Sequence, residues 1–424
     1  MHKKGLACAL ALELAMAAAP GAQADTTGSH PSLAAPYATA SHENFSKIDG
    51  WKDGLTPTAP PGFTVTRFAQ DLDSPRNAVV LPNGDVLVAE AKTEEKPNDP
   101  AYRDKGANRI RILRDADHDG VAETKEILLS GLRQPYGMVY ANDRLYVADT
   151  DGVFWIDYKL GTLKVSEDVE KHVIDHFEPG GYNNHWTRNL ILSPDGQALF
   201  VAIGSASNAG EYGETEEKRR ANVLRIDLTT GVETVYAWGM RNPVGMAIEP
   251  TTQALWVAVN ERDHLGDDLV PDYITHVEKG GFYGWPWFYY GDHEDPRLAG
   301  RHPELKGKAI VPDYAVGAHV AALGIAFGDQ TTFSQHYRSG AFVGRHGSWN
   351  RADLAGYDVV FVPFSNGKPA GPIEPFLGGF ISGATTVHGR PRSIAVTNDG
   401  ALLVTDDATG IVWRVASALA NPAR

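Results

Sequence analysis

One pattern recurs six times along this chain and constrains its fold more than any other feature. Each copy has a short apolar run, a turn of the Asn-Gly or Asp-Gly type, and a second apolar run, which together predict a β-hairpin. The six copies begin at Ser74, Gln134, Thr187, Asn242, Val320 and Arg390. Further strands are expected after most copies, at Arg109–Leu113, Gly152–Asp157, Asn222–Asp227, Val359–Pro363 and Gly410–Val415. Six repeats spaced about fifty to eighty residues apart predict an all-β protein folded as a six-bladed β-propeller.

The start of the chain differs from the repeats. Residues 1–24 have the pattern of a secretory signal peptide, with Lys3 and Lys4 before an apolar run and Ala22-Gln23-Ala24 as a small-residue cleavage site. We therefore expect export to the periplasm. The only cysteine, Cys8, lies within this segment, so disulfides and thiolate chemistry are not expected in the exported chain.

The composition limits the partners and sets the domain boundaries. The formal net charge of −14 argues against nucleic acid as a partner. Beyond the signal peptide, no apolar stretch is long enough to span a membrane. Residues 25–59 are rich in Ser, Thr, Ala, Pro and Gly and predict a linker or a loosely docked arm. Residues 60–418 are assigned to the propeller domain.

The repeats also predict where a site lies, because the innermost strands of a propeller line its central channel. Residues that precede the first strand of each hairpin should then surround one mouth of the channel, together with those that follow the second strand. The preceding residues are Arg76-Asn77, Gln134, His185 to Arg188, Arg241-Asn242, His319, and Arg390 with Arg392. The following residues are Glu90, Asp149, Ser205, Asn260-Glu261, Arg345-His346 and Asp406-Asp407.

The first of these two sets is rich in cations, although the protein is acidic overall. For any single residue, a solvated strand end or a turn cap explains the polar side chain equally well. Several arginines and histidines at one phase of the repeat instead indicate an anionic ligand held at the axis.

Six segments carry a resemblance to a known family. They are His185–Leu190, Trp238–Gly245, Asn260–Tyr273, Gly281–Pro286, His346–Arg351 and Gly389–Arg392. Together and in this order they resemble the soluble glucose/sorbosone dehydrogenases that use pyrroloquinoline quinone (PQQ), with the sorbosone branch the most similar. The resemblance covers most of residues 60–414. It implies a six-bladed propeller that holds PQQ and Ca²⁺ over the central channel.

The resemblance also implies residues that hold the cofactor. Arg390 and Arg392 match the family's arginine pair, whose guanidinium groups suit the carboxylates of PQQ. Asn242 matches a cofactor amide. Gln134 falls near a family glutamine at the cofactor, and His346 falls where glucose-oxidising relatives have a lysine.

Other matched residues imply the chemistry. His185 matches the family's base and Arg241 the arginine beside the quinone oxygen. The calcium of relatives is held by two backbone carbonyls in the loop after the fourth hairpin, which places its approximate ligand positions at Arg262 and Asp263. Ser205 stands where glucose-oxidising relatives have an aspartate that supports the histidine, and this departure argues against glucose as the substrate.

A second candidate metal site lies after the third strand of the first repeat. Asp115, Asp117, Asp119 and Glu126 have the spacing of an EF-hand calcium loop, but the flanking residues predict strands rather than helices. A structural Ca²⁺ loop between strands and an unliganded acidic hairpin turn are both consistent with this pattern.

These observations favour a periplasmic PQQ- and Ca²⁺-dependent dehydrogenase of a sugar or a sugar-derived aldehyde. Because the sequence has no Cys-x-x-Cys-His haem attachment motif, electrons are expected to leave to a separate acceptor, such as a cytochrome or a quinone. Two alternatives remain open at this point: a propeller hydrolase of the lactonase type, and a propeller that binds a ligand without catalysis.

Overall fold

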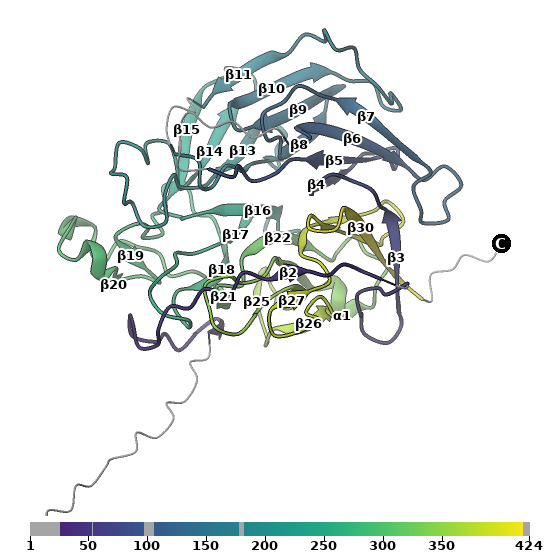
Figure 1. Ribbon diagram of the computed structural model, residues 1–424. Coiled ribbons are helices and arrows are strands. Elements are labelled where there is room, and N and C mark those ends of the chain that lie inside the picture. The colour runs from purple at the N-terminus through teal and green to yellow at the C-terminus, as the bar shows by residue number, and fades with distance from the viewer. Residues whose placement is uncertain (1–25, 53, 97–105, 178–181, 419–424) are drawn as a thin grey trace, which may run out of the picture.

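The computed structural model shows six β-sheets arranged around a common axis (Figure 1). It describes residues 26–52, 54–96, 106–177 and 182–418. The predicted signal peptide, including Cys8, lies outside the described residues. Within the described part of the chain, no helix is long and apolar enough to cross a membrane.

Each predicted hairpin forms the two innermost strands of one sheet, and the six-bladed β-propeller is confirmed. Blade 1 contains β4 (Pro75–Val80), β5 (Val86–Glu90), β6 (Arg109–Arg114) and β7 (Thr124–Leu129). Blade 2 contains β8 (Gly137–Ala141), β9 (Arg144–Asp149), β10 (Gly152–Asp157) and β11 (His172–His176). Blade 3 contains β12 (Arg188–Leu192), β13 (Ala198–Ile203), β14 (Asn222–Asp227) and β15 (Glu233–Trp238).

Of the other three blades, blades 4 and 5 have five strands and blade 6 has four. Blade 4 contains β16 (Pro243–Ile248), β17 (Leu255–Val259), β18 (Pro271–His276) and β21 (Tyr314–Ala318), with β1 (Thr27–Gly28) at its outer edge. Blade 5 contains β22 (Ala322–Phe327), β23 (Gly340–Arg345) and β24 (Asp358–Ser365), which pairs with both β25 (Lys368–Pro369) and β26 (Glu374–Leu377). Blade 6 contains β28 (Pro391–Val396), β29 (Leu402–Asp406), β30 (Ile411–Ser417) and β3 (Phe63–Ala69).

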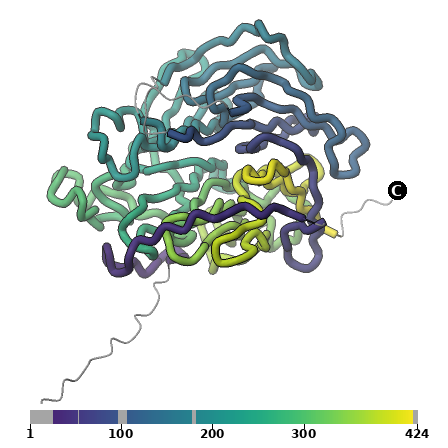
Figure 2. Tube along the Cα trace, viewed as in Figure 1, coloured from purple at the N-terminus to yellow at the C-terminus, as the bar shows by residue number. Residues whose placement is uncertain are grey.

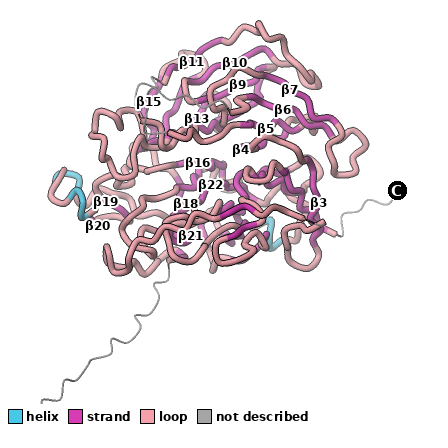
Figure 3. Tube along the Cα trace, viewed as in Figure 1, coloured by secondary structure: helices cyan, strands magenta, loops and turns pink. Residues whose placement is uncertain are grey.

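Short elements decorate these sheets, and strands predominate throughout the fold (Figure 3). Between β18 and β21 the chain forms the hairpin β19 (Phe288–Tyr289) and β20 (His293–Glu294), followed by the 3₁₀ helices η1 (Pro296–Leu298) and η2 (Pro303–Leu305). A single-turn helix, α1 (Gln335–Arg338), precedes β23.

The innermost strands approach one another so closely that glycine is required in them. A Cβ on Gly137 of β8 would lie 2.5 Å from the backbone nitrogen of Leu190 in blade 3. A Cβ on Gly324 of β22 would lie 2.2 Å from the carbonyl oxygen of Arg392 in blade 6. Because real Cβ atoms do not make such contacts, the repeated glycine of the hairpin pattern keeps the inner strands close to the axis.

Residues from five blades meet beside these inner strands. One buried apolar cluster combines Ala91, Tyr136, Trp186, Val244 and Leu323, which belong to successive blades. Side-chain amides at the start of the inner strands join neighbouring blades in addition. Asn77 donates to the carbonyl of Tyr136 at 3.0 Å, and Asn189 donates to the carbonyl of Val244 at 2.7 Å.

The two ends of the described chain close the ring. Strand β3, from the N-terminal side, pairs antiparallel with β30, from the C-terminal side, and completes blade 6. The residues before β3 form the predicted arm. They run beside the C-terminal part of the chain (Figure 2), where β2 (Lys47–Ile48) pairs in parallel with β27 (Thr386–Val387). Trp51 packs edge-on against Trp413 of β30, with ring centroids 5.1 Å apart.

The closure gives the first prediction. Trp413 is fully buried in the core of blade 6, so Trp413→Ala should lower the free energy of unfolding by about 3–5 kcal/mol. Trp155 on β10 is only half-buried, and Trp155→Ala should cost less than half as much. Urea unfolding followed by circular dichroism measures both. Equal losses for the two variants would contradict the assignment of Trp413 to the closure.

Candidate active site

A buried carboxylate organises the cations at the mouth of the channel. Asp407, which follows β29, accepts hydrogen bonds from Arg76 and from Arg392, the latter at 3.4 Å. Its other oxygen lies 2.8 Å from Nε2 of His346. Burial alone would raise the pKa of Asp407, but its contacts with His346, Arg76 and Arg392 hold this pKa well below its usual range. Residues at the start of β4 and β28 and residues that follow β23 and β29 therefore meet at one carboxylate.

This cluster carries an excess of positive charge. Burial and the nearby Arg390 lower the pKa of His346 to about 3, so this imidazole is neutral at pH 7. Arg390 donates to the carbonyls of His346 and Gly347 at 3.2 and 3.0 Å. Burial lowers the pKa of Arg76 only to about 10, which leaves its guanidinium charged. Three guanidinium groups thus stand against the single carboxylate of Asp407, an excess that suits an anionic ligand.

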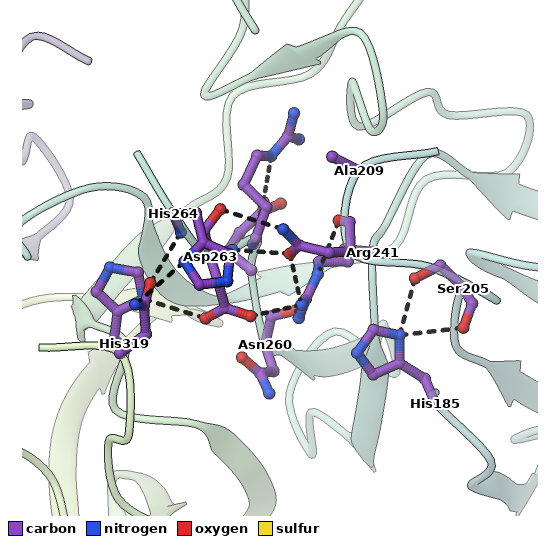
Figure 4. Close-up of polar contacts among 12 residues, drawn as sticks. His185, Ser205, Ala209, Arg241, Asn260, Asp263, His264 and His319 are labelled. Atoms are coloured by element: carbon purple, nitrogen blue, oxygen red, sulfur yellow. Dashed lines mark hydrogen bonds and ion pairs between the residues drawn. The ribbon is translucent and has the colours of Figure 1, made fainter. Parts of the chain in front are cut away.

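His185 lies beside Ser205, on the same side of the site as Arg241 (Figure 4), and the residue after it, Trp186, contacts Arg76 of the cation cluster. Its Nδ1 lies 3.0 Å from the carbonyl oxygen of Ser205 and 2.8 Å from the Ser205 hydroxyl. That hydroxyl donates its own hydrogen to the carbonyl of Ser207 at 2.6 Å. Both partners of Nδ1 are therefore acceptors, which means that Nδ1 carries the proton and Nε2 has a free lone pair. Burial, reinforced by Arg241, lowers the pKa of His185 well below its usual value, so the ring is neutral at pH 7.

Arg241 and Asp263 form the second charged centre of the mouth (Figure 4). Nη2 of Arg241 lies 2.7 Å from the Asp263 carboxylate, whose other oxygen lies 3.4 Å from Nδ1 of His319. Burial would raise the pKa of Asp263, but Arg241 and His319 outweigh it and lower this pKa to about 2. Asn208 holds the pair in place, since its side-chain oxygen accepts from Arg241 and from the Asp263 backbone at 2.8 and 2.9 Å.

The two charged centres belong to one continuous arrangement. The guanidinium of Arg76 lies over the ring of Trp186, the residue after His185, and that of Arg392 lies over Tyr136. The rings of Trp186 and Tyr136 meet edge to face with centroids 6.4 Å apart. The structure therefore brings the predicted residues from different blades to one end of the channel.

The side chains of Asn242 and Gln134 differ in whether their polar atoms have hydrogen-bond partners. Oδ1 of Asn242 is buried without a hydrogen-bond partner among the described residues, and it lies close to Gly204 and His185. Gln134 is buried with its side chain fully engaged. It donates to the carbonyl of Lys92 at 2.8 Å and accepts from Thr150 at 3.2 Å. Asn242 thus keeps an unused polar atom, whereas Gln134 supports the neighbouring backbone.

The sequence of the whole domain decides the family. Residues 57–271 and 305–417 match the sequence model described as TrAA12-like. The chain belongs to this family. It is 23% identical over 364 residues to the "Pyrroloquinoline quinone-dependent sugar dehydrogenase" of Hypocrea jecorina. The aligned region covers 75% of this chain and 78% of that protein. It is 27% identical over 214 residues to an aldose sugar dehydrogenase of Escherichia coli. This alignment covers 44% of this chain and 54% of that protein.

Solved structures agree on the fold. The iodide structure of the Trichoderma reesei Carbohydrate-Active Enzymes Family AA12 protein superposes with a TM-score of 0.70 at 20% identity, covering 88% of this chain and 100% of that chain. The holo form of the pyranose dehydrogenase PQQ domain from Coprinopsis cinerea gives a TM-score of 0.68 at 19% identity, with coverages of 88% and 100%. The predicted resemblance to soluble PQQ-dependent sugar dehydrogenases is confirmed, and the sorbosone branch stays a prediction.

In this TrAA12-like chain, the loop predicted to hold calcium is occupied by protein hydrogen bonds. The backbone carbonyl of Asp263 accepts from Asn208 at 3.2 Å and from Arg297 at 2.9 Å, which engages both of its lone pairs. The Arg262 side chain is fully buried and pairs with Glu261 and Asp295 at 2.9 and 3.1 Å. The Asp263 carboxylate is neutralised by Arg241 as well, so Asp263 offers no unused oxygen pair to an ion, and a calcium ligand at the Arg262 carbonyl stays a prediction.

The acidic loop after β6 gathers its carboxylates in a different set from the predicted one. Asp115, Asp117 and Asp119 come together with Glu123, and their ligand atoms all lie within 4.8 Å of one another. Glu126, the predicted fourth ligand, is instead an exposed residue of β7 that pairs with Ile112 across the sheet. The predicted fourth carboxylate, Glu126, is therefore corrected to Glu123. Strand β7 begins at Thr124, so Glu126 is held in the sheet by its pairing with β6 and cannot join the loop.

Sequence reasoning missed two residues of the site. Asn208 holds Arg241 and Asp263 together, and Glu217 accepts from the Ala206 backbone at 2.8 Å and from the Ser207 hydroxyl at 2.5 Å. Glu217 thereby fixes the loop that supports Ser205. Asn208 lies three residues after Ser205 in a polar run, which was the available signal. Nothing in the local sequence pointed to Glu217, because it lies in an irregular segment before β14.

The arrangement at His185 yields a prediction that needs no activity. In the wild-type protein, NMR should show a neutral His185 with the proton on Nδ1 throughout pH 6–8. In Ser205→Asp a carboxylate replaces the hydroxyl beside Nδ1, and an adjacent negative charge should raise the pKa of His185 by about one pH unit or more. Ser205→Ala keeps the backbone carbonyl and serves as the control with little change. An unchanged titration in Ser205→Asp would contradict the contact.

Proposed function

We propose that this protein is a PQQ-dependent dehydrogenase that oxidises a CH–OH group of a sugar or a sugar-derived aldehyde. The observation that carries the proposal is the cation cluster of Arg76, Arg390 and Arg392 beside a neutral histidine with a free Nε2. The names of the relatives add support, because two of them are sugar dehydrogenases and one of these is PQQ-dependent.

The residues present fit a quinone that carries several carboxylates. The cluster has an excess of positive charge, and Nε of Arg392 is buried without a partner among the described residues, as is Oδ1 of Asn242. Burying such groups is costly unless a ligand satisfies them. We therefore propose that Arg390 and Arg392 bind the carboxylates of the cofactor and that Asn242 contacts the cofactor. His346 borders the cofactor as an uncharged side chain. Gln134 supports this site through the backbone of Lys92.

The chain's own groups then account for the proton. Nε2 of His185 accepts the hydroxyl proton of the substrate, while Nδ1 stays bonded to Ser205 and holds the ring in one orientation. Arg241 supplies positive charge near the reacting centre, where negative charge develops on oxygen. A bound PQQ would supply the oxidant, by taking up the hydride of the oxidised carbon together with the two electrons that this hydride carries. Asp263 favours the charged form of His185, although burial and Arg241 together outweigh it and lower the pKa of the ring.

The serine at position 205 bears on the substrate. It orients His185 and fixes its tautomer but adds no negative charge, so the imidazolium depends on the more distant Asp263. We propose a substrate whose hydroxyl proton is lost more readily than that of glucose, such as the hydrate of a sugar-derived aldehyde of the sorbosone type.

We also propose the setting in which the enzyme works. The predicted signal peptide supports a periplasmic location. Electrons pass to a separate acceptor, a cytochrome or a quinone, because the sequence carries no haem attachment motif. For calcium we propose the loop of Asp115, Asp117, Asp119 and Glu123, where an ion stabilises the hairpin between β6 and β7, and we route no catalytic step through it.

The lactonase alternative finds no such support in the described residues. The carboxylates at the mouth, Asp407 and Asp263, are each paired with arginine rather than gathered around a common point. The one group of carboxylates close enough to share an ion in the described part of the chain is the loop after β6.

The function is tested with purified protein and PQQ. Saturable binding should change the PQQ spectrum, and addition of a sugar or sugar-derived aldehyde should bleach an artificial electron-accepting dye. Arg392→Ala should weaken PQQ binding about 10- to 100-fold, since a charged hydrogen bond is lost. Arg144→Ala, whose guanidinium stacks on Trp155 in blade 2, is the matched control.

The same assay separates binding from chemistry. His185→Ala should bind PQQ as the wild type does but lose about 10²- to 10⁴-fold in kcat, because the proton acceptor is removed. Absence of PQQ binding in the wild type, or full turnover in His185→Ala, would overturn the proposed function.

The calcium proposal has its own measurement. Adding Ca²⁺ to protein freed of metal by a chelator should raise Tm, because an ion that binds only the folded state stabilises it. Asp117→Asn should remove most of this increase, whereas Asp157→Asn, at the end of β10, should not. An increase that is the same in both variants would place the ion elsewhere.

A further inference from the structure

The N-terminal arm makes a dense set of polar contacts with loops of the site. Its residues 37–51, here called the strap, cross from blade 4 to blade 6 (Figure 1). All of these residues are described and none of them is buried, so the strap adds little to the apolar core. The stretches matched by the family model begin at residue 57, which places the strap outside them.

The first part of the strap holds the loop that follows β17. The hydroxyl of Ser41 accepts from the backbone nitrogen of Gly266 at 2.9 Å. His42 binds both carboxylate oxygens of Asp267, through its backbone nitrogen at 2.9 Å and through Nδ1 at 2.8 Å. The carbonyl oxygen of Gly266 lies 2.9 Å from Nε2 of His319, which belongs to the second charged centre of the mouth. The strap therefore reaches that centre through one residue of the loop.

The middle of the strap holds the loop that follows β23. The backbone nitrogen of Asn44 donates to the carbonyl of Trp349 at 2.7 Å. The next residue of this loop, Asn350, is fully buried and donates to the carbonyl of His42 at 3.0 Å. Its side-chain oxygen accepts from the backbone nitrogen of His264 at 2.8 Å. One buried amide thus joins the strap to loops of blades 4 and 5.

The end of the strap reaches the cation cluster. Nε1 of Trp51 donates to Oδ2 of Asp406 at 2.8 Å, and Oδ1 of this buried carboxylate accepts from the backbone nitrogen of Arg390 at 2.9 Å. Asp406 is also the neighbour of Asp407, which organises the cluster. A Cβ on Gly389, the residue before Arg390, would lie 2.7 Å from Nε1 of Trp51, so the two segments fit closely. The indole therefore fixes the carboxylate that holds the Arg390 backbone.

We propose that the strap positions the cofactor-binding loops of blades 4, 5 and 6. Trp51 is the positioning residue for Arg390, and His42 is the positioning residue for the loop that carries Asp263. A segment that binds all three loops fixes their relative places and reduces the freedom that they lose when a ligand orders them, which raises affinity. This inference rests on the proposed function, because the ligand concerned is PQQ.

The first test measures positioning in the protein without PQQ. Trp51→Phe keeps an aromatic ring against Trp413 but removes the donor to Asp406. Hydrogen exchange at the backbone amide of Arg390 should rise about five- to tenfold, while Tm changes by less than about 2 °C. Lys47→Ala, an exposed change on β2 within the strap, is the matched control and should leave the exchange rate unchanged. An unchanged rate in Trp51→Phe would overturn the role of Trp51.

The second test measures the affinity for PQQ from the change in its spectrum. Trp51→Phe should raise the Kd for PQQ about five- to tenfold, because Arg390 is held less firmly. His42→Ala removes the side-chain contact with Asp267 at the other end of the strap and should raise Kd about threefold. This exposed change keeps the test valid if Trp51→Phe does not fold. Lys47→Ala should bind PQQ as the wild type does.

The two tests separate the strap from the proposed function. Equal PQQ affinity in the wild type, Trp51→Phe and His42→Ala would overturn the strap proposal. Absence of PQQ binding in the wild type would overturn the proposed function instead. Faster amide exchange at Arg390 in Trp51→Phe would then still support the positioning of this residue by the strap.

Discussion

The close approach of the six innermost strands is the constraint on which the rest of this structure depends. Where β8 and β22 pass their neighbours, there is no room for a side chain, and glycine at these positions brings the blades together at the axis. Once the inner strands are fixed, the residues just before and just after them are fixed as well. Arg241 precedes β16 of blade 4, and Arg76 and Arg392 lie at the start of β4 and β28 in blades 1 and 6. All three reach one end of the channel because the strands do.

The chemistry of the mouth follows from buried charges that are only partly compensated. Asp263 and Arg241 neutralise each other, whereas Asp407 is shared by Arg76 and Arg392 and leaves positive charge over. An uncompensated buried cation destabilises a fold unless something anionic comes to it. The uncompensated charge therefore lowers the stability of the empty protein and raises its affinity for an anionic ligand. Such an arrangement is common at functional sites.

Much of this architecture could be predicted from the sequence. The hairpins were predictable because turn chemistry and apolar alternation are local signals, and the alignment of six copies indicated Arg76, Arg241 and Arg392 as ring members. The fourth ligand of the acidic loop was misplaced, because a spacing rule from helix-flanked loops does not hold where β7 begins at Thr124. Asn208 and Glu217 could not be predicted to act together, since their contacts are set by irregular segments whose paths depend on the whole fold. Closure of blade 6 by β3 joins residues more than three hundred positions apart and leaves no local signal.

That closure has a consequence for the order of events during synthesis. Blade 6 supplies Arg390, Arg392 and Asp407, and its sheet combines the first long strand of the chain with the last. Nascent chains therefore have no complete cation cluster until translation has ended and the last strand has docked. Insertion of a quinone must then be a late step of maturation, made on a finished ring and, if the chain is exported, on the far side of the membrane it crossed.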